Sequence, residues 1–272
     1  MNGTGMLKSD LNRLFHGKRL YISILLVFGI AFLGLVPEIR AAGGSVSVYY
    51  LINARHGLGA FFVAMTTIVA LPFGLGYAED VKYNYIHCLH SRQGLYIYGT
   101  AHILTTAIGG FLTVFVGYLL FYGGALLKFP LCDSHDMEML AELVLVGGAS
   151  VYERLLLSEF PISYLICVCA TEAMGYSFLA TLTVAASTRV KNIFIILSVP
   201  LIFHYGSTLL CEMLELPGVF RWYYVLSSGG FLANLNLNIW RTMLFVFLYF
   251  FSFICIVGVV FISGMEKKYK NG

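Results

Sequence analysis

Long apolar stretches separated by short polar segments dominate the hydrophobicity pattern of the chain. A helix needs roughly 20 apolar residues to cross a bilayer. Six stretches approach or exceed this length and are predicted to span a membrane: about 20–37, 57–76, 95–122, 161–187, 192–211 and 242–264. The pattern therefore predicts an all-α integral membrane protein in which residues 1–272 form a single transmembrane domain.

The segment before the first span, residues 6–18, has the pattern of an amphipathic helix. Leu7, Leu11, Leu14 and Phe15 share one helical face, and polar or charged residues occupy the others. A helix of this kind lies in the membrane interface with its apolar face toward the acyl chains. We therefore expect an interfacial helix ahead of the first crossing.

The polar segment 77–92, between the second and third predicted spans, is also amphipathic. Tyr77, Val81, Tyr85 and Leu89 recur every fourth residue, which places them on one helical stripe. Acidic residues at its start and basic residues at its end suit the helix dipole. Two interpretations remain open: a helix that docks on a partner protein, or a solvated turn that returns the chain to the membrane.

Two segments on the opposite side of the predicted membrane are too long and too apolar to be plain loops. Met137–Phe160 and Leu216–Trp240 are predicted to form short outer helices or re-entrant turns. The aromatic residues of the second segment favour the boundary between water and lipid. The sequence assigns no role to the longer stretch 123–160.

The composition excludes a soluble globular domain. Charged residues make up 11% of the chain and hydrophobic residues 59%, whereas a soluble chain has about a quarter of its residues charged. Of the Lys and Arg residues, eleven fall on the side of the two termini and six on the other: Arg40, Arg55, Lys128, Arg154, Arg221 and Arg241. Because cytoplasmic segments carry the excess of basic residues, both termini are predicted to be cytoplasmic in a multi-pass cell-membrane protein.

Two ionisable residues are expected near the middle of the bilayer. Glu172 lies about ten residues into the fourth span and His204 about twelve residues into the fifth, which are similar depths at ~1.5 Å per residue. A charge in hydrocarbon is costly, so both side chains should face the bundle interior, on adjacent helices. They could form part of a translocation path, a proton-sensitive pair, or an interhelical hydrogen bond that only fixes packing.

Motifs of catalysis and cofactor binding are absent from the sequence. His87 and His90 have a spacing compatible with a metal site, but no second pair of ligands lies nearby, so chance placement is favoured. The patterns HExxH, GxSxG and GxxxxGK[ST] do not occur, so the chain has no P-loop of its own. Cys132 and Cys211 could both lie outside and pair, but free thiols are the preferred interpretation.

The arrangement of these segments resembles one family over nearly the whole chain. A basic entry to the first span, Lys18-Arg19, is followed by a second span ending in Leu71-Pro72-Phe73-Gly74. A polar helix then begins at Tyr77-Ala78-Glu79-Asp80 and ends near Ser91-Arg92, and a short basic turn at 188–192 separates the fourth and fifth spans. This resembles the permease subunits of exporter-type ABC transporters, the six-span class whose ATPase is a separate chain.

The resemblance implies a dimer of permeases, homo- or heteromeric, each docking an ATPase subunit. The docking role falls on the helix 77–92, with these coupling residues: Tyr77, Glu79, Asp80, Tyr85 and Arg92. The interfacial helix 6–18 would be the second contact with the ATPase. ATP and Mg would bind to the ATPase, leaving this chain without cofactor or catalytic residues, and nucleic acid is not an expected partner.

In this family, closure of the two ATPases tilts the permease helices and moves cargo outward or extracts it from the bilayer. The substrate stays open, because such permeases serve peptides, lantibiotics, lipids, drugs and ions. The alternative is an ion-coupled carrier or channel in which Glu172 and His204 form the coupling site. A membrane-embedded enzyme is a third candidate, weakened by the missing catalytic motifs.

Overall fold

The computed structural model describes residues 3–41, 46–54, 59–83, 85, 94–146, 148–158, 160–226 and 238–270. All regular secondary structure in these ranges is helical, as the sequence predicts. The α-helices are α1 (Gly3–His16), α2 (Lys18–Ala41), α3 (Val48–Ala54), α4 (Gly59–Ile68), α5 (Gly76–Lys82), α7 (Leu95–Leu126), α8 (Ser134–Val146), α9 (Ile162–Ser187), α10 (Ile193–Met213), α11 (Trp222–Leu226) and α12 (Ile239–Lys270). Short 3₁₀ turns lie at Glu153–Leu155 and Gly218–Phe220.

Five of the described helices are long and apolar enough to cross a membrane, which is consistent with a membrane protein. They are α2, α7, α9, α10 and α12. These helices contain most of the predicted first, third, fourth, fifth and sixth spans. Helix α7 extends beyond its predicted span on the C-terminal side, and α12 begins before and ends after its own.

The predicted second span, 57–76, is not one continuous helix in the described residues. Helix α4 has 10 residues and ends at Ile68, and residues 69–75 form successive turns before α5 begins. Pro72 lacks the backbone N–H that an α-helix requires in its interior. A Cβ on Gly74 would collide with Thr183 and with the carbonyl of Ala70, so the turn depends on glycine at this position.

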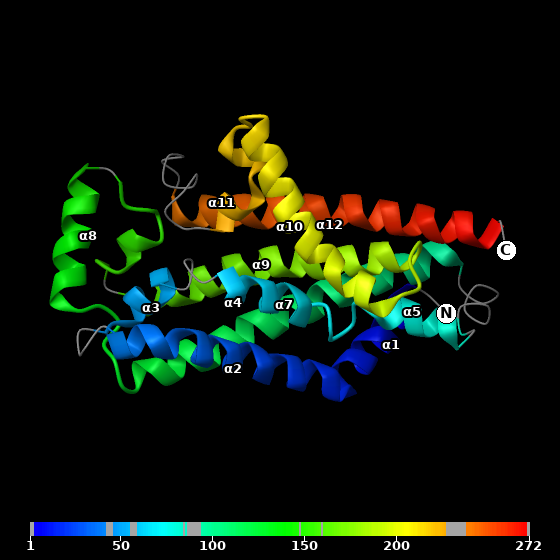
Figure 1. Ribbon diagram of the computed structural model, residues 1–272, viewed down its shortest axis with the longest axis horizontal. Helices are drawn as coiled ribbons and strands as arrows, with labels where there is room; N and C mark the ends of the chain where they lie inside the picture. The colour runs from blue at the N-terminus through cyan, green and yellow to red at the C-terminus, as the bar shows by residue number, and fades with distance from the viewer. Residues whose placement is uncertain are drawn as a thin grey trace.

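The broken segment from α3 to α5 passes from one end of the molecule to the other (Figure 1). At the α8 end, the backbone N–H of Val48 in α3 donates to the carbonyl of Pro130 at 2.9 Å. At the opposite end, which we call the α5 end, α5 lies beside α1, and the described end of α12 lies there too. The described N- and C-terminal helices therefore end on the same side of the bundle.

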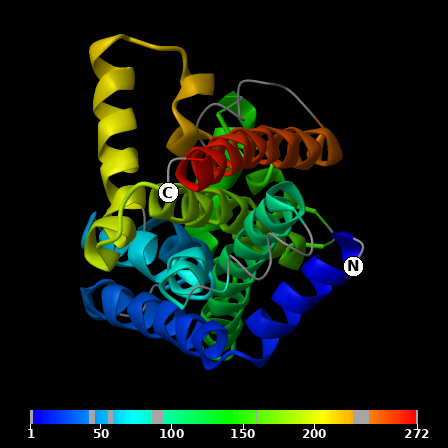
Figure 2. The ribbon, with the colours of Figure 1, turned by 90° about the vertical axis from the view of Figure 1, so that its right-hand side faces the viewer.

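Helix α9 occupies the centre of the bundle, surrounded by α7, α12, α10 and α4 (Figure 2). It approaches α7 closely at Gly110, where a Cβ would lie 2.9 Å from the Cβ of Ala180. The Ser177 hydroxyl of α9 donates to the carbonyl of Ala107 in α7 at 2.8 Å. Close backbone contact through small residues with an interhelical hydrogen bond is the packing expected of helices in lipid.

At the α8 end, most of helix α8 lies within the segment 137–160, and α11 lies within 216–240, so short helices occur in both segments for which the sequence predicts them. Helix α8 lies across this end of the bundle rather than along it (Figure 1). Helix α10 projects away from the bundle over its C-terminal half in both views, and α11 returns the chain to it (Figures 1 and 2). Trp222 of α11 is buried against Phe178 of α9 and Phe203 of α10.

Candidate functional site

Helix α5 is fixed to the bundle by a buried carboxylate. The guanidinium of Arg13, in α1, donates to both carboxylate oxygens of Asp80 at 3.1 and 3.2 Å. The hydroxyl of Tyr98, in α7, donates to the same carboxylate at 2.8 Å. Only 4% of Asp80 is exposed, so its charge depends on these donors rather than on water.

A second ion pair attaches α5 to α2 nearer the surface. Nη2 of Arg19 lies 2.7 Å from Oε1 of Glu79, and both side chains are partly exposed. Burial opposes the charge of Arg13, but the hydrogen bond and charge of Asp80 raise the pKa of Arg13 above its ordinary value. Helix α5 is therefore held by cations from α1 and α2 and by a phenol from α7.

A buried acid and imidazole lie next to Arg13, whose Nη1 is 3.9 Å from Oδ1 of Asp10. Oδ2 of Asp10 is 3.6 Å from Nδ1 of His102, and both residues are fully buried. Neither side chain has a hydrogen-bond partner among the described residues. The ring of His102 packs against Phe73 and Tyr98, with centroids 4.7 and 5.3 Å apart.

The structure places Asp10 in the buried stripe of the N-terminal helix, although the sequence pattern put it off the apolar face. Met6, Asp10 and Leu14 are buried, and Phe15 is exposed, as a residue that faces lipid would be. These buried residues follow a period of four, so Asp10 lies in the buried stripe of α1 and not on its polar face. An acid in a stripe between methionine and leucine was the signal in the sequence that could have revealed this cluster.

The residues predicted to contact a partner at α5 divide into buried and exposed sets. Tyr77 is buried against Phe261, with ring centroids 5.1 Å apart, and Asp80 is buried as described above. Both are therefore directed into the chain and not toward a partner. Glu79 is half-buried, Tyr85 is exposed, and Arg92 lies outside the described residues.

The exposed aromatic residue of this region that sequence reasoning missed is Tyr83. It is 74% exposed and directly follows α5, beside the exposed Lys82. Of the predicted helix 77–92, the structure describes helix α5 to Lys82, a turn at Tyr83 and the isolated position Tyr85. The exposed surface at α5 is therefore formed by Lys82, Tyr83 and Tyr85.

The two ionisable residues predicted inside the membrane lie on helices that pack together. Glu172 is buried in α9, as expected of a carboxylate at this depth. His204, in α10, lies in an aromatic cluster, with its ring 3.9 Å from Phe62 and 5.3 Å from Trp222. This environment holds His204 between α4 and α11, and packing is the role that its described contacts support.

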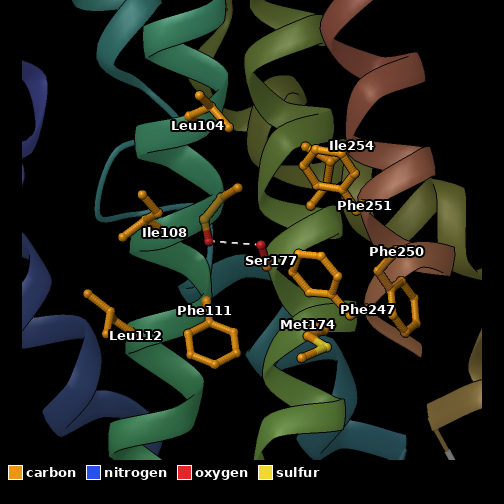
Figure 3. A pocket seen from close by; sticks show the side chains of 11 residues that line it. Leu104, Ile108, Phe111, Leu112, Met174, Ser177, Phe247, Phe250, Phe251 and Ile254 are labelled. Atoms are coloured by element: carbon orange, nitrogen blue, oxygen red, sulfur yellow. Dashed lines mark hydrogen bonds between the residues drawn. The ribbon is translucent and has the colours of Figure 1, made fainter. Parts of the chain in front are cut away.

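A pocket of ≈ 360 Å³ lies between α7, α9 and α12 (Figure 3). Phe111, Met174, Phe247 and Phe250 are among its lining residues, and its surface is almost wholly apolar. The hydroxyl of Ser177 also lines it but is engaged by the carbonyl of α7. Such a pocket suits hydrocarbon and offers no group that would select a charged ligand.

Metal and disulfide chemistry find no support in the described part of the chain. No group of three or more His, Cys, Asp or Glu side chains is placed to hold a metal ion there. The proposed pair His87 and His90 lies outside the described residues. Cys132 and Cys211 are both free thiols, as preferred from the sequence.

Comparison with known proteins finds no matching protein-family model, no similar curated protein and no similar solved structure.

Proposed function

We propose that the chain is the permease subunit of an exporter-type ABC transporter, driven by ATP hydrolysis on a partner ATPase. The observation that carries the proposal is the union of α1 and α5 by the Arg13–Asp80 ion pair. The sequence resemblance assigns an ATPase contact to each of these two elements. This pair, in which Asp80 is buried and Arg13 is partly exposed, joins two segments that are 67 residues apart, so that they would move together.

This unit is connected to the long helices in a way that suits force transmission. Asp80 is bonded to Tyr98 at the start of α7, and Glu79 is paired with Arg19 at the start of α2. Helix α7 in turn packs along the central helix α9. A displacement of α5 would therefore move the ends of α2 and α7, which is the motion that a permease requires.

The proposed topology places the α5 end in the cytoplasm of a multi-pass cell-membrane protein. The basic bias of the sequence and the common location of the described ends of α1 and α12 support this orientation. The broken segment α3–α5 would supply the sixth crossing. ATP and Mg would bind to the ATPase, and a second permease subunit would complete the complex.

We assign the ATPase contact to Tyr83 and Tyr85, because both are exposed at α5, with Glu79 beside them. Aromatic anchors often carry a large share of an interface, and truncation of such an anchor costs about 2 kcal/mol or more. The buried residues Tyr77 and Asp80 would position this surface without touching the partner.

The first test asks whether a reading frame beside this gene encodes a P-loop protein. The chain is then co-expressed with such an ATPase and tested by co-purification and ATPase assays. Replacing both Tyr83 and Tyr85 with Ala should weaken the complex by roughly 30-fold or more and uncouple hydrolysis from transport. Tyr205→Ala removes an equally exposed tyrosine from α10 and should leave the complex intact. Full coupling without Tyr83 and Tyr85 would show that α5 is only a turn.

The burial of Glu172 favours a second candidate, an ion-coupled carrier or channel. An intramembrane carboxylate in the central helix is the type of residue that coupling ions use. Under this alternative, the purified chain alone would move substrate or ions in proteoliposomes under an ion gradient, and Glu172→Gln would abolish the flux. A permease subunit without its ATPase would show no such transport.

A further inference from the structure

A second pocket, of ≈ 380 Å³, lies at the α5 end between α5, the turn that joins α9 to α10, and the end of α12. Three lysines converge on it from these separate segments: Lys82, Lys191 and Lys268. Lys82 is the last residue of α5, Lys191 lies in the turn between α9 and α10, and Lys268 lies in α12. The three lysines are far apart in the sequence and are brought together by the fold.

The charge of this pocket is uncompensated by its described walls. Glu79 is the acidic residue among the described lining residues, and its carboxylate is already paired with Arg19 at 2.7 Å. Nζ of Lys268 lies 5.5 Å over the ring of Tyr77, which holds the ammonium at the pocket. Three ammonium groups around one cavity repel each other unless an anion lies between them.

The remaining walls are apolar, and they continue onto a surface suited to hydrocarbon. Leu75, Val81, Val190 and Ile193 line the pocket beside the lysines. Helix α10 begins at Ile193, and it exposes this residue and the two that follow, Phe194 and Ile195. A small soluble anion gains nothing from such walls, whereas an amphiphile places its headgroup among the lysines and its chains along α10.

We propose that this pocket binds an anionic phospholipid, with Lys82, Lys191 and Lys268 as ligands of the phosphate. Basic pockets between membrane helices on the cytoplasmic side have this chemistry. The acyl chains would lie on the exposed start of α10. The proposal requires only that the α5 end lies at a membrane surface, and it does not depend on an ATPase partner.

Binding at this site would connect α5 to α12 and to the turn between α9 and α10. One headgroup would contact all of these segments, and only in the folded chain, so anionic lipid should stabilise the α5 end against unfolding. Zwitterionic lipid carries no net charge and should stabilise it far less.

The experiment measures retention of phosphatidylglycerol and of phosphatidylcholine by the purified full chain, using native mass spectrometry after titration in detergent. We expect the chain to prefer phosphatidylglycerol. Each lysine near a membrane surface contributes roughly fivefold to the binding of anionic lipid, so Lys82→Gln, Lys191→Gln and Lys268→Gln together should weaken it by about a hundredfold.

The matched control removes the same charge from the same end but outside the pocket, by Lys8→Gln, Lys18→Gln and Lys267→Gln. These exposed lysines report the general attraction of a basic surface, and their loss should leave the selectivity intact. Equal losses in both triple variants would overturn the proposal. Circular dichroism and gel filtration establish that each variant is folded, and Lys191→Gln alone, with a roughly fivefold loss, serves if the triple variant does not fold.

A soluble anion is distinguished by competition. Inorganic phosphate or glycerol phosphate that displaces the bound phosphatidylglycerol at comparable concentration would show that the site recognises phosphate alone and would overturn the lipid assignment. Failure of both compounds to compete, together with the loss in the pocket variant, is the expected result.

Discussion

The two ends of the bundle each bury a carboxylate, and they stabilise it in different ways. At the α5 end, Asp80 is neutralised by the cation of Arg13 and by the hydroxyl of Tyr98. At the α8 end, Glu153 accepts from the backbone N–H of Ser150 at 2.7 Å and from the hydroxyl of Tyr49 at 3.0 Å. The carboxylate of Asp80 has a cation as partner, and the described donors to the carboxylate of Glu153 are neutral.

The site at the α8 end is largely local. Ser150 and Glu153 satisfy each other reciprocally, because the N–H of Glu153 also donates to the hydroxyl of Ser150 at 3.1 Å. This is the capping-box arrangement, and it opens the 3₁₀ turn at Glu153–Leu155. Only the bond from Tyr49 reaches across the sequence.

The ion pair at the α5 end connects helices that are far apart in the sequence, whereas most hydrogen bonds of Glu153 are to its near neighbours in the chain. At the α5 end, removal of Arg13 leaves the buried Asp80 with the neutral donor Tyr98 and also removes the cation that lies 3.9 Å from a second acid, Asp10. At the α8 end, removal of a donor leaves a carboxylate that keeps another. We therefore expect the α5 end to be more sensitive to loss of a single partner, and each prediction below tests this comparison.

The largest expected effect follows Arg13→Ala. It leaves the buried carboxylate of Asp80 with the hydroxyl of Tyr98 and without its cation. Because the Arg13 side chain is 40% exposed and water screens the pair, we expect a cost of about 2.5 kcal/mol, below the roughly 3–5 kcal/mol of a fully buried pair. The free energy of unfolding of the purified chain, measured by SDS titration with far-UV circular dichroism, should fall by this amount.

The double variant with Asp80→Ala provides the control for Arg13→Ala. Removing both charges should restore part of the loss, so the two effects should be non-additive. Additive effects would mean that the pair contributes nothing as a pair, and the contrast between the two ends would disappear.

The next effect concerns the thiol of Cys132, near the α8 end. Burial, and then the charges of Asp136 and Asp133, raise the pKa of Cys132 from 9.0 to about 11. Because the thiolate is the reactive form, alkylation at pH 8 should be about a hundredfold slower than for a thiol of ordinary pKa. A variant that keeps only this cysteine should show a rate that rises with pH up to about 11.

Replacement of Asp136 by Asn sharpens the measurement on Cys132. The loss of a nearby negative charge should lower the pKa of the thiol and increase the alkylation rate at pH 8. A midpoint near 9 in the unsubstituted chain would contradict the proposed environment at the α8 end.

A smaller effect is expected from Glu153→Ala at the α8 end. The substitution removes an ionised acceptor from two hydrogen bonds, and bonds to charged groups contribute about 1.5–3 kcal/mol. Part of this loss is offset because the substitution also removes the cost of keeping the carboxylate of Glu153 away from water, and the donors left behind, the N–H of Ser150 and the hydroxyl of Tyr49, are uncharged. We expect a decrease in the free energy of unfolding of about 2 kcal/mol.

Tyr49→Phe removes only the distant donor to Glu153 and should cost about 1 kcal/mol, because the local capping box remains. A larger loss from Tyr49→Phe than from Arg13→Ala would reverse the ranking of the two ends.

The sequence predicts the helical class and five of the long helices because hydrophobicity over about 20 residues reports the need for lipid. The sequence does not predict which of these helices lies at the centre of the bundle and which lies at its edge. The central helix α9 has 78% of its most apolar window buried, whereas α10 has 11%, although their hydropathies are similar at 1.5 and 1.9. Hydropathy cannot separate a helix surrounded by protein from one surrounded by lipid.

The broken second span and the ion cluster show two further limits. Residues 57–76 are apolar throughout, so the break near Pro72 and Gly74 was visible only as isolated turn signals. Asp10 and Arg13 were assigned to a polar surface because a pattern of charges does not reveal a partner 67 residues away. The capping box at Ser150 and Glu153 has the S-x-x-E spacing, so the sequence does carry a signal for this local contact.

The smallest effect should follow Arg19→Ala, although its ion pair with Glu79 is shorter than any contact of Arg13. The Arg19 side chain is 54% exposed and that of Glu79 is 30% exposed, so water replaces the lost partner. Exposed pairs contribute about 0–1 kcal/mol, and salt screens them. The free energy of unfolding should therefore fall by less than about 1 kcal/mol, and by still less in high salt.

The same measurement on Arg13→Ala supplies the comparison, because both substitutions remove one guanidinium that holds α5. If Arg19→Ala were as costly as Arg13→Ala, the distance between the charges, and not their burial, would govern the strength of these pairs. The burial of Asp80 would then not explain how α5 is held.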